Sequence, residues 1–202
     1  MKILGIGNAI VDVICKVDDN FISQNGLTKS TMKLIFDENE FKKLLTNLKI
    51  EKTVSGGSVA NSIVGISQLG NKVGFIGKVS DDDLGKQFRS SLSEHGLSDF
   101  TVLEEENEQT GLCAIFITPD GERTMNTYLG AGAQLSMGDL NEESIKNCNI
   151  LYMEGYLWDR LPSKEAFMYA SSINKQSGGK NALSLSDVFC VEAHRDSFID
   201  LI

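Results

Sequence analysis

Two polar side chains, Asn8 and Asp12, follow the first apolar run of the sequence, residues 2–7. That run is apolar nearly throughout and ends on a glycine, a pattern typical of a buried strand. Ligands of open α/β sheets lie at the carboxyl ends of strands, so an amide and a carboxylate here are placed to meet one. The carboxylate could hold the hydroxyls of a diol, although asparagine and aspartate are also common wherever a chain turns.

A second candidate is the segment SGGSVANS, residues 55–62, which opens an amphipathic helix on two adjacent glycines. Gly56 and Gly57 allow a backbone so tight that a ligand can lie against main-chain amides, and the first helical turn offers free N–H groups. Asn61, about one turn into the helix, could donate to and accept from a hydroxyl. A glycine-rich loop that merely enters a packed helix would explain the same residues.

Neither glycine-containing segment matches a nucleotide-binding fingerprint. In GIGNAI, residues 5–10, the third glycine position of the dinucleotide motif is occupied by Ile10, and the residues that follow look like strand. No GKS or GKT follows Gly57, which excludes a Walker-type phosphate loop.

The composition excludes several classes of function. A formal net charge of −9 argues against nucleic-acid partners and anionic membrane surfaces. The 4 cysteines and 2 histidines lack metal-ligand spacing, so we expect reduced thiols and no metal site. No run approaches the ~20 apolar residues of a membrane span, and the first apolar run is too short for a signal peptide. We therefore expect a cytoplasmic protein.

The apolar periodicity predicts strands alternating with helices, and hence an α/β fold with a doubly wound, mostly parallel sheet. We expect the strands of this sheet at 2–7, 72–79, 150–156 and 181–187. We expect helices at 18–25, 37–48, 57–70, 80–97, within 135–148, at 163–176 and at 191–202, the second of them starting with a capping box at Asp37 and Glu40. Strands at about 11–17, 31–36 and 111–129 lack intervening helices and are predicted to form a small antiparallel sheet.

Two acidic runs are interpreted structurally. The three aspartates at 81–83 open a helix and indicate a cap with a solvated face. The run EEENE at 104–108 is typical of a solvated charged surface.

The last residues, HRDSFIDLI, stop in the middle of an apolar stripe without a glycine, a cationic last turn or a polar tail. Helices usually end on such signals. We interpret this ending as a fold whose C-terminal part is missing, the alternative being a short C-terminal helix packed on the sheet.

Four segments together resemble the ribokinase-like (PfkB) family of carbohydrate and nucleoside kinases, and within it the adenosine-kinase-like branch. The likeness spans essentially the whole chain and keeps the order and spacing of the segments. Val59, Ile63 and Ser80 depart from the family pattern, in which small residues or glycine are usual. The segments are GNAIVD at 7–12, SGGSVANS with QLG at 55–70, GFIGKVSDDDLG at 74–85 and RTMNTYLGA at 123–131.

The resemblance implies that the residues discussed first bind a sugar. Asp12 matches the family's aspartate that binds sugar hydroxyls, and Asn8 matches the asparagine beside it. Gly56 and Gly57 match the glycine pair that closes on the sugar. Asn61 matches the asparagine that hydrogen-bonds it.

Further contacts and a lid are implied in the same way. Glu154 is a candidate sugar contact, and Arg123 is a candidate contact from the lid, its alternative being a surface charge on a hairpin. The strands at 11–17, 31–36 and 111–129 correspond to the family's lid, which closes over the sugar and excludes water. Such a lid can also pair two subunits as a homodimer.

The family's residues for phosphoryl transfer are absent from the 202 residues. The family uses a GAGD-type loop, whose amides form an anion hole and whose aspartate removes the hydroxyl proton, and an NxxE motif that organises Mg²⁺. The resemblance therefore implies that the sites for ATP and Mg²⁺ lie beyond this chain, which alone is expected to be inactive.

The sequence predicts the substrate-binding, lid-bearing portion of a kinase for the primary hydroxyl of a ribosyl compound, adenosine or a related nucleoside first. The alternatives are a kinase for a free sugar such as ribose or fructose, and a non-catalytic protein that binds a nucleoside or sugar. A purine would need an apolar slot near the lid. Candidates for that slot, each also explained by sheet packing, are Met32, Leu34, Phe36, Phe116 and Tyr128.

Overall fold

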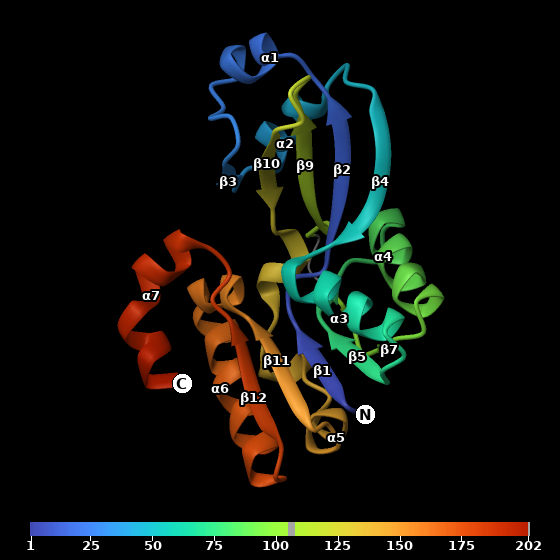
Figure 1. Cartoon of the computed structure of the whole chain (residues 1–202), viewed down its shortest axis with the longest axis vertical. Coiled ribbons are helices and arrows are strands. Elements are labelled where there is room, and N and C mark those ends of the chain that lie inside the picture. Colours follow the sequence, from blue (N-terminus) through green and yellow to red (C-terminus); the bar gives the residue numbers. More distant parts are fainter. Residues whose placement is uncertain (105–107, 202) are drawn as a thin grey trace.

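The computed structural model describes residues 1–104 and 108–201, except for the side chains of 200 and 201. Its lower half in Figure 1 is built on a five-stranded sheet in which all strands run parallel. This confirms the predicted doubly wound, mostly parallel sheet. In spatial order the strands are β12 (Lys180–Ser184), β11 (Ile150–Glu154), β1 (Ile3–Ile6), β5 (Val73–Ile76) and β7 (Ser98–Asp99).

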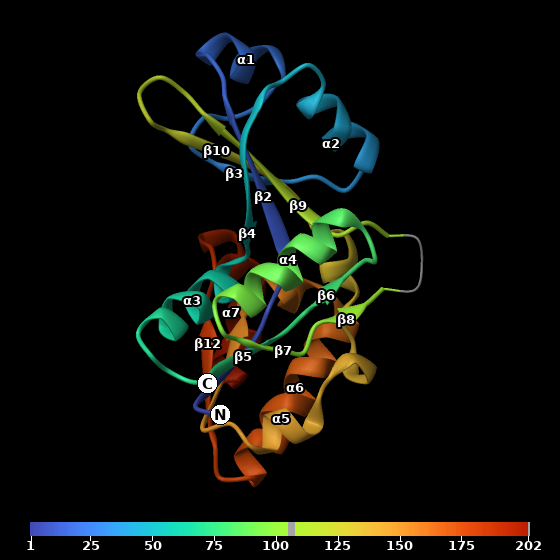
Figure 2. The ribbon, with the colours of Figure 1, turned by 90° about the vertical axis from the view of Figure 1, so that its right-hand side faces the viewer.

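Helices cover both faces of this sheet (Figure 2). On one face α3 (Ser58–Gln68) and α4 (Asp83–Glu94) pack over Val73 and Phe75. On the other face α5 (Glu142–Lys146) and α6 (Leu161–Gln176) pack over Leu4 and Ile6. Successive side chains of a strand point to opposite faces, so each strand contributes to both layers of the core.

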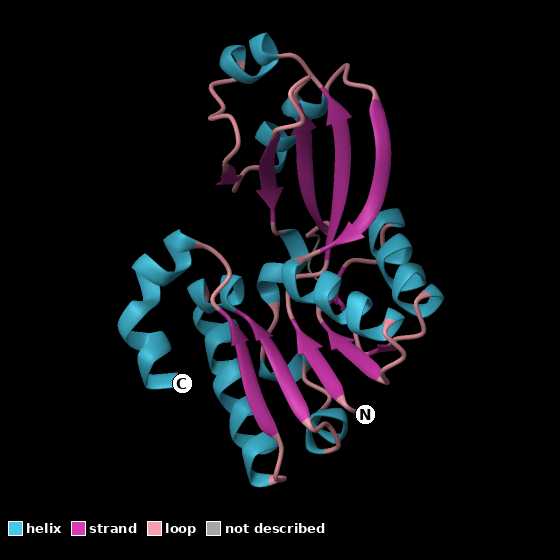
Figure 3. Cartoon of the chain, in the orientation of Figure 1, coloured by secondary structure: helices cyan, strands magenta, loops and turns pink. Residues whose placement is uncertain are grey.

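A second five-stranded sheet stands above the first (Figure 3), with α1 (Asp19–Gln24) and α2 (Glu38–Leu45) packed on one of its faces. Its order is β3 (Met32–Leu34), β10 (Arg123–Tyr128), β9 (Gly111–Ile117), β2 (Ile10–Lys16) and β4 (Ile50–Gly56). We call this sheet and its two helices the lid, and the α/β part below it the body.

The expectation of an antiparallel lid is only partly correct. β9 pairs antiparallel with β10 and β2 with β4, but β2 pairs parallel with β9, and β3 with β10. The parallel pairs arise because the chain leaves the lid after β4, passes through the body and returns with β9 in the same direction as β2. The strand β4 is not among the expected lid strands, and β3 is shorter than expected.

The remaining elements are mostly short, and several of them were not predicted from the sequence. They include a small sheet of β6 (Lys78–Val79) and β8 (Val102–Leu103), the 3-10 turns η1 (Gly130–Gln134), η2 (Met137–Asp139) and η3 (Gly155–Asp159), and α7 (Val188–Leu201). In the part of the chain that the structure describes, no helix has the length and apolar character needed to cross a membrane.

Two local expectations are wrong. The capping box at the start of α2 does not form, because Asp37 accepts a bond from the N–H of Asn39 while Glu40 pairs with Lys33 at 2.9 Å. Glu104 is not solvated, since its side chain is 7% exposed and lies 2.9 Å from the ammonium of Lys78. The other predicted members of that acidic run at 105–107 lie outside the described residues.

Asp82 is the cap predicted from the acidic run at 81–83. One of its oxygens accepts from the N–H of Gly85 at 2.7 Å and from the hydroxyl of Thr110 at 2.7 Å. Its other oxygen accepts from the N–H of Thr110 at 2.8 Å. Asp82 thereby fixes the start of α4 to the segment that enters β9.

We expect Asp82→Ala to lower the free energy of unfolding by about 1–2 kcal/mol, because it removes a helix cap and the bonds to Thr110. The matched control is Asp81→Ala, which removes only an exposed ion pair to Lys86 and should change stability by less than about 0.5 kcal/mol. Urea unfolding of both variants measures the difference. Equal effects would contradict the assignment of Asp82 as the cap.

Candidate substrate-binding site

A cavity of about 240 Å³ lies where the lid meets the carboxyl ends of β1 and β11. The strands of the lid form one wall, and the start of α3 forms another. Its lining residues are Asn8, Ile10, Asp12, Met32, Leu34, Gly57, Ser58, Asn61, Cys113, Ile115, Arg123, Met125, Thr127, Leu129, Glu154 and Tyr156.

The predicted site residues come together at this cavity. All of them except Gly56 line it, and Gly56 lies next to Gly57 with its backbone against Asp12. They arrive from separate parts of the chain: the β1–β2 connection, β2, the β4–α3 turn, β10 and the end of β11. The sequence placed the candidates at strand ends and at a helix start, and the fold brings those ends to one place.

Glu154 is fully buried at the end of β11, and both its carboxylate oxygens are bonded within the protein. Oε1 accepts from the side-chain amide of Asn8 at 2.8 Å, and Oε2 accepts from the N–H of Val59 at 2.9 Å. Burial raises the pKa of Glu154, while these two donors act in the opposite direction. Glu154 thus holds Asn8 and the first turn of α3 in place, a role that the sequence did not predict.

The bonds of Glu154 orient the Asn8 side chain. Since its amide nitrogen donates to Glu154, its oxygen Oδ1 points elsewhere, and this fully buried atom has no protein partner in the structure. A buried acceptor without a donor is costly unless a ligand or water supplies one. A substrate hydroxyl in the cavity that Asn8 lines would have to reach this oxygen beside the backbone of Gly132.

The two glycines are required by close backbone approach. A Cβ added at Gly56 would lie 2.5 Å from the carboxylate of Asp12, and one added at Gly57 would lie 2.3 Å from the carbonyl oxygen of Asn8. Gly57 also has a φ of +106°, a region that side-chain-bearing residues rarely adopt. The tight turn before α3 therefore depends on Gly57, whereas a side chain at Gly56 would displace the carboxylate of Asp12.

Asp12 is a carboxyl group of this site with a raised pKa. Burial raises its pKa from 3.8 to about 6, and the positive charge of Arg123 partly offsets this effect. Cys113 also lines the cavity, but burial raises the pKa of its thiol to about 12, so the thiol stays protonated at neutral pH. The acidic and basic side chains among the described residues that line the cavity are Asp12, Glu154 and Arg123.

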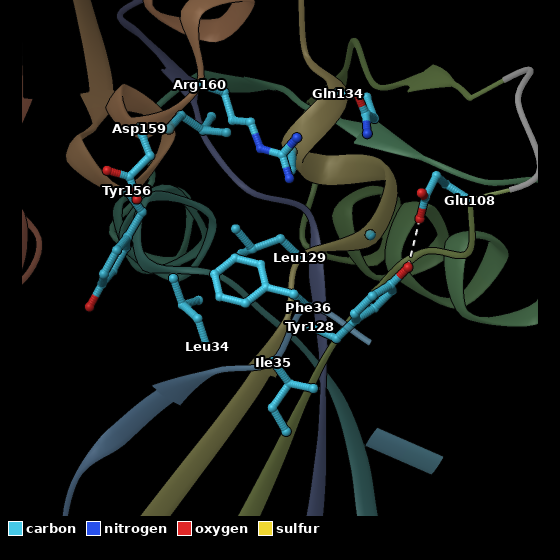
Figure 4. Close-up of a pocket in the computed structure, with 13 residues that line it drawn as sticks. Leu34, Ile35, Phe36, Glu108, Tyr128, Leu129, Gln134, Tyr156, Asp159 and Arg160 are labelled. Carbon is cyan, nitrogen blue, oxygen red and sulfur yellow. Dashed lines mark hydrogen bonds between the residues drawn. The ribbon is translucent and has the colours of Figure 1, made fainter. Parts of the chain in front are cut away.

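The apolar slot is built partly from other residues than expected. Met32 and Leu34 do line the cavity, whereas Phe116 is fully buried on the opposite face of β9, where it packs against Phe21. Alternation along β9 places Cys113 and Ile115 on the cavity face and Phe116 on the other. Phe36 and Tyr128 line an adjoining cavity instead (Figure 4).

Several lining residues were missed from the sequence, and Tyr156 is the most informative. It stands two residues after Glu154, in η3, and lines the cavity beside the lid strands. An aromatic residue at the end of the strand predicted at 150–156 was its only signal. Among the described residues there is no group of three or more His, Cys, Asp or Glu side chains that could hold a metal ion.

Comparisons with known proteins identify related kinases. The family model described as pfkB family carbohydrate kinase matches residues 6–193. A 5-dehydro-2-deoxygluconokinase of Clostridium botulinum (strain Eklund 17B / Type B) is 34% identical over 145 residues, which is 70% of this chain and 43% of that protein. A probable fructokinase-3 of Arabidopsis thaliana is 29% identical over 125 residues, covering 61% of this chain and 36% of that protein.

Solved structures show the same arrangement. A probable sugar kinase protein from Rhizobium etli CFN 42 superposes with a TM-score of 0.92 at 37% identity, over 99% of this chain and 60% of that one. The adenosine kinase from Sinorhizobium meliloti gives a TM-score of 0.90 at 37% identity, over 99% of this chain and 61% of that one. The chain thus spans less than half the length of the curated relatives named above and about 60% of these solved chains.

Proposed function

The chain belongs to the pfkB family of carbohydrate kinases, and from that premise we propose that it binds the substrate of an ATP-dependent kinase acting on the primary hydroxyl of a ribosyl compound. Adenosine or a related nucleoside is the first candidate. One observation carries the proposal: the cavity under the lid is lined by both hydrogen-bonding and apolar side chains, which suit the two parts of a nucleoside.

The hydrogen-bonding side chains of the cavity suit the sugar. Asp12 can accept bonds from two neighbouring hydroxyls, and Asn61 can both donate and accept. Asn8 contributes the unpartnered Oδ1, which needs a hydroxyl donor. A ribose diol supplies such donors, so we assign these three residues, together with Gly56 and Gly57, to the sugar.

The apolar side chains of the cavity suit a flat base. Met32, Leu34, Ile115 and Met125, from the lid strands, line it together with Tyr156. A free sugar has no apolar part to fill this space, and burying apolar surface there contributes about 25 cal/mol per Å². The cavity therefore favours a nucleoside over ribose or fructose.

A kinase for a free sugar or sugar acid is the second candidate, because two of the compared relatives are named 5-dehydro-2-deoxygluconokinase and probable fructokinase. An acidic sugar would need cationic partners. Arg123 is the one cationic side chain among the residues that line this cavity, and Asp12 and Glu154 oppose it. The charge balance of the cavity thus favours a neutral substrate.

Within the proposed kinase, the residues of this chain bind the riboside, orient it and exclude water. Closing of the lid would hold the primary hydroxyl away from bulk solvent. ATP with Mg²⁺ supplies the phosphoryl group, and we assign both to residues outside these 202, since no GAGD or NxxE run occurs in them. The apolar lid residues Ile14 and Ile117, which pack around the buried Ile115, are the proposed place for pairing with a second copy.

The proposal is tested by calorimetry with adenosine and ribose at pH 7.5. We expect adenosine to bind at least about ten-fold more tightly than ribose, because burial of a purine face adds more than the ~1.4 kcal/mol that a ten-fold change requires. We also expect no ATP-dependent formation of adenosine monophosphate by this chain. Preferential binding of ribose would favour the free-sugar kinase, and absence of binding by either compound would contradict the proposal.

A further inference from the structure

A second cavity, of about 120 Å³, adjoins the first and is not used by the sugar or base assigned above (Figure 4). Leu34, Leu129 and Tyr156 line both cavities, so these apolar and aromatic side chains lie where the two cavities meet. The residues that line only the second cavity are Ile35, Phe36, Glu108, Tyr128, Gly130, Ala133, Gln134, Leu157, Asp159 and Arg160.

Arg160 gives this second cavity its cationic group. It follows η3 directly and precedes α6, and its side chain extends from there towards the ribbon of η1, which carries Gln134 (Figure 4). Within the ranges 1–104 and 108–201, the structure gives its guanidinium neither an ion pair nor a hydrogen bond. An arginine presents five donors in a planar fork that matches a carboxylate.

The carboxylates that line the cavity are already engaged. Glu108 accepts from the hydroxyl of Tyr128 at 2.6 Å. Asp159 pairs with the imidazole of His194, from α7. Neither carboxylate bonds to Arg160, although Arg160 follows Asp159 in sequence, so the donors of its guanidinium remain open to a ligand.

The walls around Arg160 suit the edge of an aromatic ring. Phe36 is 79% exposed, which is unusual for so large an apolar side chain, and Tyr128 and Tyr156 line the same space. Exposed aromatic side chains beside a cavity are typical of ligand-binding surfaces. A base bound in the first cavity would point its far edge towards the second cavity, because Leu34, Leu129 and Tyr156 line both cavities.

We propose that the second cavity is a specificity subsite for a carboxylate carried on the far edge of the base, and that Arg160 binds it. This inference rests on the proposed function and names its substrate class more narrowly: ribosyl compounds whose aromatic base bears a carboxylate. The planar carboxylate matches a single guanidinium and a space of about 120 Å³. A carboxylate carries one negative charge, which the guanidinium of Arg160 balances. A phosphate carries nearly two, so the carboxylates of Glu108 and Asp159 would repel it more strongly.

The test measures calorimetric affinities of three probes: purine riboside, and purine ribosides with a carboxamide or a carboxylate on carbon 6. We expect the chain to bind the carboxylate most tightly. Arg160→Ala should lower the affinity for the carboxylate probe at least about ten-fold, because it removes a charge-assisted bidentate contact. The affinity for purine riboside should change by no more than about two-fold. The matched control is Arg195→Ala, an exposed arginine on α7, which should change none of the three affinities.

The outcomes separate this inference from the proposed function. Unchanged carboxylate binding by the Arg160→Ala variant, or equal weakening of all three probes, would overturn the subsite while leaving the riboside assignment intact. Failure of all three probes to bind the unsubstituted chain would overturn the proposed function and the subsite with it. Arg160→Lys should restore only part of the carboxylate affinity, since an ammonium cannot donate in a fork. Thermal unfolding of each variant shows that the fold is retained.

Discussion

Replacing Gly57 with alanine is expected to lower the free energy of unfolding by at least about 3 kcal/mol and to weaken riboside binding. The backbone of Gly57 has φ +106° and ψ 137°, and holding a side-chain-bearing residue in such a region costs about 1–3 kcal/mol. The added Cβ would also lie 2.3 Å from the carbonyl oxygen of Asn8, an atom of the backbone that cannot rotate away. Relief requires the turn before α3 to move, and Asn61 and the Val59 N–H move with it.

The matched control lies in the same helix. Gly65 has nothing within 4 Å of an added Cβ and sits inside α3, so Gly65→Ala should stabilise the chain by about 0.5–1 kcal/mol. Urea unfolding followed by circular dichroism measures both variants, and calorimetry with adenosine measures binding. A Gly57→Ala variant that loses less than about 1 kcal/mol, or that keeps full affinity, would contradict the role given to this turn.

The body of the fold was predictable because its signals are local. Asp82 caps α4 where the sequence indicated a cap, and apolar periodicity located α3, α4 and α6. The lid was harder, because strand β4 reads IEKTVSG, with exposed charged residues and no apolar alternation. It forms a strand because it pairs with β2 at the edge of the sheet. Such long-range pairing cannot be recognised from a short window of sequence.

In the site, too, features with a local sequence signal could be predicted and long-range contacts could not. Asn8, Asp12 and Asn61 could be predicted, because each stands at the end of one element whose type was readable from the sequence. The bonds of Glu154 could not, since they join positions 146 and 95 residues apart and exist only where β1, β11 and α3 meet. Sequence reasoning made Glu154 a direct contact of the sugar, but in the structure both its oxygens are engaged by protein donors. Its first role here is to position Asn8.

Riboside binding should depend on pH through Asp12. Its carboxylate form accepts hydroxyl bonds, and burial raises its pKa to about 6, so affinity should fall as the pH drops below 6. Stability should change in the opposite sense. The folded chain holds the Asp12 proton up to about pH 6, whereas the unfolded chain releases it near pH 3.8, so this group lowers stability as the pH rises through that window.

Asp12→Asn is therefore expected to abolish measurable riboside binding and at the same time to stabilise the chain at pH 7. Loss of two charged hydroxyl contacts should weaken binding by about 100-fold or more. Removing the buried charge should raise the free energy of unfolding by up to about 3 kcal/mol, the equivalent of a pKa raised from 3.8 to about 6 at ~1.4 kcal/mol per pKa unit.

The stability gain of Asp12→Asn should shrink towards zero near pH 4, where Asp12 is protonated in the folded chain. Urea unfolding at pH 4 and pH 7, with adenosine calorimetry at pH 7, tests both halves of this prediction. Lost affinity in a more stable protein cannot arise from misfolding, so that pair of results would assign Asp12 to the ligand. Unchanged affinity would remove Asp12 from the site, and a stability loss at pH 7 would show that its charge is compensated by the protein itself.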